Sequence, residues 1–272
     1  MKKLPLALAA IALAAAPARA DHGDAALAPL QLRALLDAAT FEGDDALGRY
    51  RIRFQADGRA VREDRRGALE GSWRAGDAGY CETFEGRERC GPATFDGNFL
   101  VVTGDIATAM TAVSGAALKR EAEAPLHLIS ISGVGERIGA LRLSVDGDAL
   151  VVAPDAGGLT PGPHALHVHE RGDCGPALKD GAPVAGLAAG GHYDPRGAGH
   201  HDHGDGTLPL GDLPEMTVGS DGMARTPIRS TSLRLYEVLG RAIMVHAYGE
   251  APPAAGMAPG GGARIACAIV PR

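Results

Sequence analysis

The chain has 272 residues, of which 45% are hydrophobic and 22% are charged, and its net charge is -6 at pH 7. An acidic balance argues against nucleic acids and anionic membranes as partners, because both attract basic patches. After the first twenty residues, no uninterrupted apolar run is long enough to span a bilayer. We therefore expect a soluble protein of one or two domains.

Residues 1–20 have the pattern of a cleaved secretory leader. Lys2 and Lys3 precede an apolar run at 4–16, and Ala18 and Ala20 form a small-residue cleavage signal. Cleavage after Ala20 removes three basic residues and no acidic one, so the net charge changes from -6 to -9. We expect the mature protein to be periplasmic or secreted, in an oxidising compartment.

Four cysteines remain after cleavage, as a close pair, Cys81 and Cys90, and a distant pair, Cys174 and Cys267. Four cysteines allow three connectivities, and pairing within each half of the chain is the simplest if the halves are separate domains. No Cys-x-x-Cys spacing occurs, which argues against a zinc knuckle.

Residues 21–122 are predicted to form a small β-rich module of unknown function. An amphipathic helix is indicated by the spacing of Leu32, Leu35, Leu36 and Ala39. The segment 49–54 alternates arginines with Tyr50, Ile52 and Phe54, which indicates a half-buried strand whose arginine face is solvated. Further short strands are predicted around 71–73, 80–84 and 99–103, and a disulfide between Cys81 and Cys90 would staple the module.

The Ala- and Thr-rich stretch 104–124 ends in a charged run, which we interpret as a linker with a boundary near residue 122. Strand patterns return at 126–131, 138–145 and 149–153, with glycines at the turns. This spacing predicts an antiparallel sandwich or barrel over residues 123–272. His127 lies in the first of these strands, and we interpret it as a structural or surface histidine.

Seven of the ten histidines lie between residues 161 and 212. His167 and His169 flank Val168, so on a strand both imidazoles project from one face and can bind a single ion. Further groups follow at His192, at 200–203 and at Asp212. Because imidazole is a ligand for copper, zinc, iron and nickel, the segment predicts a metal site.

Six motifs follow one another in the second half: GLTPGPHALHVHERGDC (158–174), ALKDG (177–181), AGGHYDP (189–195), LGDLPEMTV (210–218), GRAIMVHA (240–247) and GGGARIAC (260–267). With these motifs, roughly residues 124–272 resemble the bacterial periplasmic copper-zinc superoxide dismutases. The resemblance implies an all-β fold, an eight-stranded Greek-key barrel. It also implies conversion of superoxide to oxygen and hydrogen peroxide by alternate reduction and oxidation of a histidine-bound copper.

By this resemblance, copper is bound by four histidines, His167, His169, His192 and His246. His192 also bridges to zinc and donates a proton to the product, and Arg264 attracts the anionic substrate. The residues agree with copper, since four imidazoles around one ion form a redox-capable site that copper prefers. His164 matches a family histidine that ties the loop without binding metal, and Cys174 and Cys267 match the family disulfide.

Zinc in the family is bound by the bridging histidine, two further histidines and an aspartate. His201 and Asp212 match, but Pro209 stands where the other histidine is expected and has no donor atom for a metal. Either His203 completes the site, with His200 or Asp205 as further candidates, or the protein uses copper alone. An aspartate that joins the two sites in the family is also missing, and Glu250 is the only acid between 247 and 262.

Two other readings of the function are open at this stage. A copper-binding or copper-buffering protein on a dismutase scaffold would explain Pro209 and the missing aspartate. Alternatively, the N-terminal module binds an unknown partner and carries the dismutase as a fused effector. Members of the family occur as dimers and as monomers, so a homodimer is possible.

Overall fold

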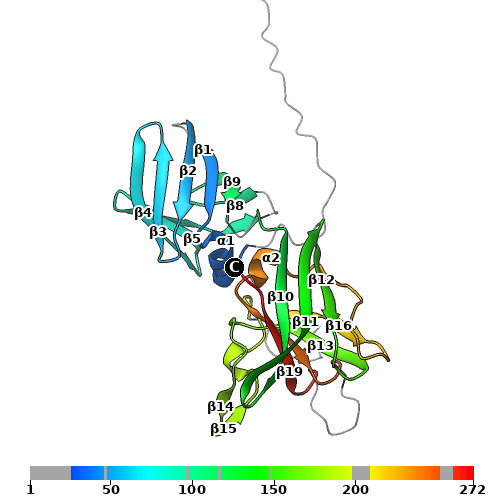
Figure 1. The fold of residues 1–272 in the computed structure, drawn as a ribbon. Helices are drawn as coiled ribbons and strands as arrows, with labels where there is room; N and C mark the ends of the chain where they lie inside the picture. The colour runs from blue at the N-terminus through cyan, green and yellow to red at the C-terminus, as the bar shows by residue number, and fades with distance from the viewer. Residues whose placement is uncertain are drawn as a thin grey trace, which may run out of the picture.

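The computed structural model describes residues 26–45, 48–95, 99–115, 118–147, 149–197, 209–251 and 260–272. The predicted leader and the zinc-loop residues His200, His201, His203 and Asp205 lie outside these ranges. Within them, no helix is both long and apolar enough to cross a membrane. Two large antiparallel sheets, one from each half of the chain, make up most of the molecule (Figure 1).

The first half is a helix followed by a nine-stranded sheet with the order β6-β5-β4-β3-β2-β1-β9-β8-β7. The helix and the early strands are α1 (Pro29–Leu36), β1 (Thr40–Asp45), β2 (Gly48–Phe54), β3 (Arg59–Asp64) and β4 (Gly67–Gly76). The others are β5 (Gly79–Phe84), β6 (Arg87–Gly91), β7 (Ala93–Phe95), β8 (Phe99–Val102) and β9 (Thr108–Ser114). The predicted helix and β-rich module are confirmed, whereas β9 lies in the 104–124 stretch, where no strand was predicted.

The core of this half is built from one face of the sheet and the buried face of α1. Phe54 makes edge contacts with Phe41, Trp73 and Tyr80, with ring centroids 5.7 to 6.0 Å apart. Opposite the core, Arg51 pairs with Glu42 and Arg53 with Glu63, so the arginine row of β2 is solvated, as predicted. Cys81 of β5 faces Cys90 of β6 and forms the predicted disulfide.

The second half contains an eight-stranded sheet with the order β16-β13-β18-β19-β10-β11-β12-β17, which confirms the predicted eight strands. Its strands are β10 (Glu121–Ser130), β11 (Gly133–Asp146), β12 (Ala149–Ala156), β13 (Gly162–Val168), β16 (Asp212–Val218), β17 (Ile228–Ser230), β18 (Ala242–His246) and β19 (Arg264–Ile269). Ala224 bridges to Ala156, the last residue of β12, and to Val218, the last residue of β16, which connects opposite sides of the sheet. A hairpin, β14 (Ala177–Lys179) and β15 (Ala182–Val184), and a short helix, η2 (Leu187–Ala189), lie in the loop after β13.

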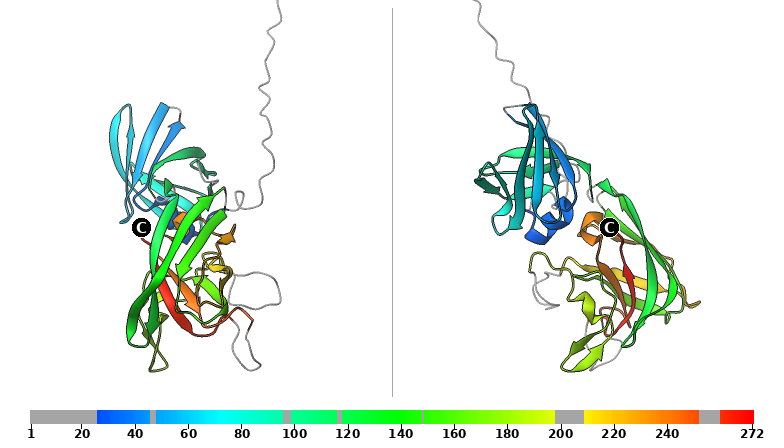
Figure 2. Two further views of the ribbon diagram at one scale, coloured as in Figure 1. Left: turned by 45° about the vertical axis from the view of Figure 1, so that its right-hand side comes forward. Right: turned by 60° about the vertical axis from the view of Figure 1, so that its left-hand side comes forward.

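The two halves meet where α1 lies beside the short helix α2 (Leu235–Val238), between the two sheets (Figures 1 and 2). Gln31 of α1 donates a buried hydrogen bond from Nε2 to Glu237 Oε1 at 2.9 Å. Tyr236 of α2 belongs to the core of the first half, with its ring 5.8 Å from that of Phe95. Each half therefore has its own core, and α2 joins them.

Candidate metal centre

Three segments far apart in the sequence bring the predicted copper ligands together. His167 lies on β13, which pairs with β16 on one side and β18 on the other. His169 follows the end of β13 and forms an isolated bridge with His192. His246 is the last residue of β18. The antiparallel pairing of β13 with β18, together with the bridge between His169 and His192, therefore brings the four histidines together.

The four histidines form one compact cluster. A ring nitrogen from each of His167, His169, His192 and His246 lies within 4.8 Å of those of the others. The ring centroid of His167 is 4.0 Å from that of His192 and 4.5 Å from that of His246. Since His167, His169 and His246 are buried, the cluster is almost closed to solvent.

Each ring is held by a partner on the side away from the cluster. His169 Nδ1 donates to Gly190 O and His246 Nδ1 to Gly262 O, both at 3.0 Å. His192 Nδ1 lies 2.6 Å from Asp212 Oδ1, and His167 Nε2 lies 2.5 Å from Glu250 Oε1. Such outer contacts fix the orientation of a ligating ring and leave its other nitrogen for the metal.

The inner nitrogens fit a bound cation. His169 Nε2 is buried and has no hydrogen-bond partner among the described residues. Because a buried unsatisfied nitrogen costs roughly 1–3 kcal/mol, ligation would remove a real penalty. His167 Nδ1 and His246 Nε2 lie 3.1 Å apart, and both rings have their other nitrogen engaged outside the cluster. A single cation between the rings would satisfy these nitrogens together.

Burial keeps the rings in the form that binds metal. The pKa of His169 falls to about 2, chiefly because burial removes solvent from the charged ring and secondly because Arg264 is close. The pKa of His246 falls to about 3, chiefly through burial and then through His167. Both imidazoles are therefore neutral at neutral pH, which is the ligating form.

The carbonyl of Gly190 connects the cluster to Arg264. It accepts both from His169 Nδ1 and from Arg264, whose NH2 lies at 2.8 Å, while Arg264 NH1 donates to Gly186 O at 2.7 Å. Gly190 has a φ of 83°, and a Cβ there would lie 2.2 Å from Glu170 Oε2, so the position requires glycine. The guanidinium is consequently held beside the cluster, and burial lowers its pKa.

On the zinc side, the structure brings His192 and Asp212 together, as the contact between His192 Nδ1 and Asp212 Oδ1 shows. Pro209 is buried, and its carbonyl accepts from Asp212 N at 3.1 Å. The proline thus lies where it shapes the turn before β16 without offering a side-chain ligand. The other two predicted zinc residues, His201 and His203, lie outside the described residues.

Among the described residues, His164 and His127 lie outside the cluster. His164 Nδ1 donates to His246 O at 2.6 Å, and its Nε2 lies 2.8 Å from Thr160 O, so it ties strand to loop as predicted. His127 makes a contact of 3.1 Å with Gly135 O, in agreement with a structural role. Cys174 and Cys267 form a disulfide that joins the loop after β13 to β19.

Two contributors to the site were not predicted as such. Glu215 Oε1 accepts from the backbone nitrogen of Glu250 at 2.7 Å and so holds the segment that reaches His167. The carbonyl of Gly190 acts through the backbone, which residue types do not reveal. In the sequence, these two contributors were indicated only by the position of Glu215 within the LGDLPEMTV motif and by the Gly-Gly pair before His192.

Comparisons with known proteins agree with this geometry. The family model for copper/zinc superoxide dismutase (SODC) matches residues 138–270. Superoxide dismutase [Cu-Zn] 2 of Salmonella typhimurium is 39% identical over 150 residues, covering 53% of this chain and 85% of the relative. Superoxide dismutase [Cu-Zn] of Escherichia coli K12 is 36% identical over 167 residues, covering 60% of this chain and 94% of the relative.

Among solved structures, the Cu/Zn superoxide dismutase from Brucella abortus matches with a TM-score of 0.50 and 36% identity, covering 55% of this chain and 98% of the other. The monomeric copper, zinc superoxide dismutase from Salmonella enterica matches with a TM-score of 0.50 and 38% identity, covering 55% and 99%. From its sequence relatives, its family match and its fold, the chain belongs to the copper/zinc superoxide dismutase family.

Proposed function

We propose that the four-histidine cluster is the copper site at which this protein converts superoxide to oxygen and hydrogen peroxide. The observation that carries the proposal is the set of four imidazole nitrogens within 4.8 Å of one another, with an unpartnered nitrogen on His169. Copper bound there supplies one-electron chemistry, cycling between two oxidation states. The comparisons favour this dismutase function over the copper-buffering alternative.

The side chains around the cluster have separate proposed roles. His167, His169 and His246 hold the metal, with their rings oriented by Glu250, Gly190 and Gly262. His192, oriented by Asp212, is the proposed proton donor through Nε2. Arg264 is the proposed docking group for superoxide, because a fixed guanidinium retains its positive charge beside the cluster.

Zinc is the second metal of the family, and we propose that His192 and Asp212 contribute to its site here. His201 and His203 are the proposed further ligands, and Pro209 replaces a histidine. A set of three imidazoles and one carboxylate suits the tetrahedral geometry of zinc. If zinc is bound, His192 and Asp212, whose side chains already contact each other, would both help to hold it.

The test compares wild-type protein with His169→Ala after reconstitution with both metals. We expect wild type to bind close to one copper per chain and to consume superoxide well above free-copper controls. His169→Ala should lose most of its copper and its activity, because His169 Nε2 faces the cluster. His127→Ala is the matched control, since that histidine lies outside the cluster. Bound copper and zinc are measured by mass spectrometry, and the decay of superoxide is measured by stopped flow. Equal activity in His169→Ala and wild type would contradict the proposed site.

We further propose export to the periplasm after cleavage at Ala20, with residues 21–122 and 123–272 as two domains. The leader pattern, the two disulfides and the bacterial relatives support export. Separate cores in the two halves support the division, although β10 begins at Glu121, two residues before the proposed second domain. The homodimer and a partner for the N-terminal module stay predictions.

A further inference from the structure

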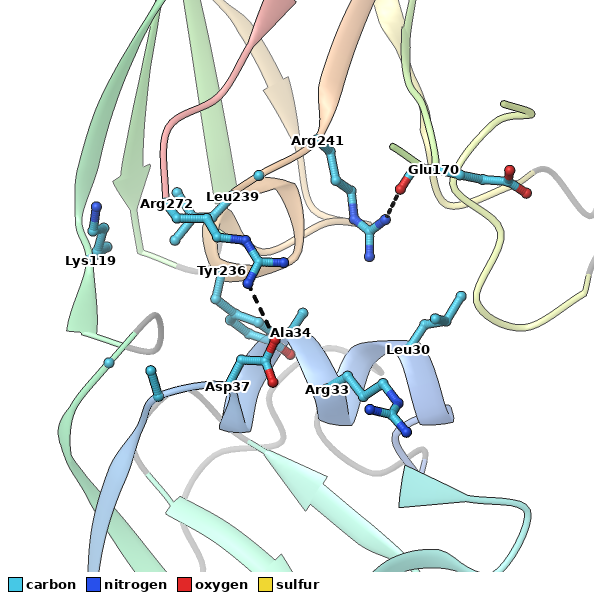
Figure 3. A pocket seen from close by; sticks show the side chains of 13 residues that line it. Leu30, Arg33, Ala34, Asp37, Lys119, Glu170, Tyr236, Leu239, Arg241 and Arg272 are labelled. Atoms are coloured by element: carbon cyan, nitrogen blue, oxygen red, sulfur yellow. Dashed lines mark hydrogen bonds and ion pairs between the residues drawn. The ribbon is translucent and has the colours of Figure 1, made fainter. Parts of the chain in front are cut away.

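A cavity of about 520 Å³ lies between the two halves of the molecule. One wall is α1, with Leu30, Arg33 and Ala34, and the facing wall comes from α2 and the residues after it (Figure 3). Lys119, before β10, and Arg272 are also among the lining residues. The volume is within the range of small-molecule sites, and such sites are frequent at domain interfaces. The cavity is distinct from the histidine cluster, since none of the four histidines lines it.

The charge of the cavity is opposite to that of the whole chain. Its lining includes four basic side chains, from Arg33, Lys119, Arg241 and Arg272, and two acidic residues, Asp37 and Glu170. The carboxylate of Asp37 is already paired with Arg272 NH1 at 3.3 Å. The carboxylate of Glu170 points away from the cavity, and it is the backbone oxygen of this residue that contacts Arg241 (Figure 3). In a chain with a net charge of -6, this local excess of positive charge favours an anion.

Arg241 is the strongest sign of an anionic ligand. Its guanidinium is half-buried, donates to the carbonyls of Glu237 and Glu170, and lies 4.0 Å from the centroid of the Tyr193 ring. Burial lowers its pKa, and the attraction of the Glu237 carboxylate offsets this only in part; none of the described carboxylates forms an ion pair with Arg241. A cation that has lost solvent without a direct ion pair would be stabilised further by an anion in the cavity.

Arg33 and Lys119 also line the cavity. Among the described residues, neither side chain has an ion pair or a side-chain hydrogen bond. Leu30, which is 45% exposed, supplies an apolar surface beside them, and Ala34, Tyr236 and Leu239 continue it across the cavity. The cavity therefore combines a cationic side with an apolar side.

We propose that this cavity binds a small amphipathic carboxylate, with its carboxylate at Arg241 and its apolar body against Leu30 and Leu239. A guanidinium is a strong partner for a carboxylate, and the charges of Arg33 and Lys119 add to the attraction. Inorganic anions would satisfy the charges but leave the apolar wall in water. Uncharged apolar molecules would cover the wall and leave Arg241 without an anion in the cavity.

The experiment is calorimetric titration of the full-length mature protein with octanoate, acetate, inorganic phosphate and 1-octanol. We expect saturable binding of one octanoate per chain, with acetate, phosphate and octanol each binding at least tenfold more weakly. Arg33→Gln and Lys119→Gln should each weaken octanoate binding roughly threefold to fivefold, because each removes one partly solvated charge. Leu30→Ser should weaken octanoate binding and leave phosphate binding unchanged.

Arg142→Gln is the control, because this arginine is exposed on β11 and pairs with Glu123 outside the cavity. Circular dichroism checks that every variant is folded. Absence of saturable octanoate binding would overturn the proposal. So would acetate, phosphate or octanol binding as tightly as octanoate, or octanoate affinity that is unchanged in Arg33→Gln and Lys119→Gln.

Discussion

Glu250 and Asp212 hold two neighbouring histidines of the cluster in the same way. Glu250 reaches His167 Nε2, and Asp212 reaches His192 Nδ1, in each case on the side away from the cluster. The sequence raised the question whether Glu250 compensates for the aspartate that this chain lacks. The contact places Glu250 where it would orient His167, a proposed copper ligand, as Asp212 orients His192.

Removing the Glu250 carboxylate should weaken copper binding. Carboxylates behind a ligating histidine typically contribute about 10-fold to 100-fold in metal affinity, and we expect a loss in this range for Glu250→Ala. Glu250→Gln retains an acceptor oxygen and should lose less. Competition with a chelator of known affinity measures the change, and Glu136→Gln, at an exposed position on β11, is the control. Wild-type copper affinity in Glu250→Ala would exclude this role.

Arg264 should control how ionic strength affects turnover. Its guanidinium is fixed by Gly186 and Gly190 beside the cluster, so its charge can guide an anion in an otherwise acidic protein. We expect Arg264→Ala to lower kcat/KM by about tenfold or more and to flatten its dependence on salt. Arg264→Lys should restore part of the salt dependence. The test is to measure kcat/KM over a range of ionic strength, with Arg142→Ala as the control. If Arg264→Ala shows the same salt dependence as wild type, Arg264 does not guide the anion.

At the scale of elements, alternation predicted those strands that have one clearly buried face. β2 and β10 to β12 were predicted because large apolar residues alternate with polar ones. β9 was missed because its sequence, TAMTAVS, has small side chains and only Met110 is buried. In β4 only Trp73 is buried, so the ten-residue strand was recognised only near that tryptophan.

The metal centre, too, could be predicted from the sequence only in part. Strand periodicity alone places His167 and His169 on one face, but it cannot bring His192 and His246 to them. Their grouping followed from family resemblance. The pairing of β13 with β18 supplies the physical reason for His246, and the bridge between His169 and His192 supplies it for His192. The carbonyls of Gly190 and Gly262 belong to the backbone, and the contact of Glu250 depends on how its loop folds. Residue types and spacing do not encode these contacts directly.

At the scale of the whole molecule, one buried hydrogen bond ties the starts of two helices. Gln31 Oε1 accepts from Ala28 N at the start of α1, and Glu237 Oε2 accepts from Arg234 N at the start of α2. The side chains of Gln31 and Glu237 then meet each other across 206 residues of sequence. Tyr193, next to His192, also donates to Glu237, at 3.4 Å. The first half of the chain is thereby connected to the loop that carries His192, a proposed copper ligand.

Glu237 makes the stability of this junction dependent on pH. Burial raises its pKa above the ordinary 4.5, and this outweighs the opposing hydrogen bonds from Arg234 N, Gln31 and Tyr193. Because Glu237 binds its proton more tightly in the folded state than in the unfolded state, protonation of Glu237 stabilises the fold. This stabilisation is fully present below pH 4.5 and is lost as the pH rises through the pKa of Glu237 in the folded state. The titratable and charged groups facing this carboxylate are Tyr193, Tyr236, Arg196, Arg234 and Arg241.

The prediction concerns the free energy of unfolding of wild type minus that of Glu237→Gln, measured by urea titration between pH 4 and 8. Because Gln does not titrate, this difference should decrease as the pH rises above about 4.5 and become constant above the folded pKa of Glu237. An exposed acid should show no such trend, and Glu136→Gln provides that comparison. A difference that is flat, or that increases with pH, would mean that burial does not govern the protonation of Glu237. A decrease confined to Glu237→Gln would instead identify this carboxyl as the group through which pH acts on the contact between the two halves.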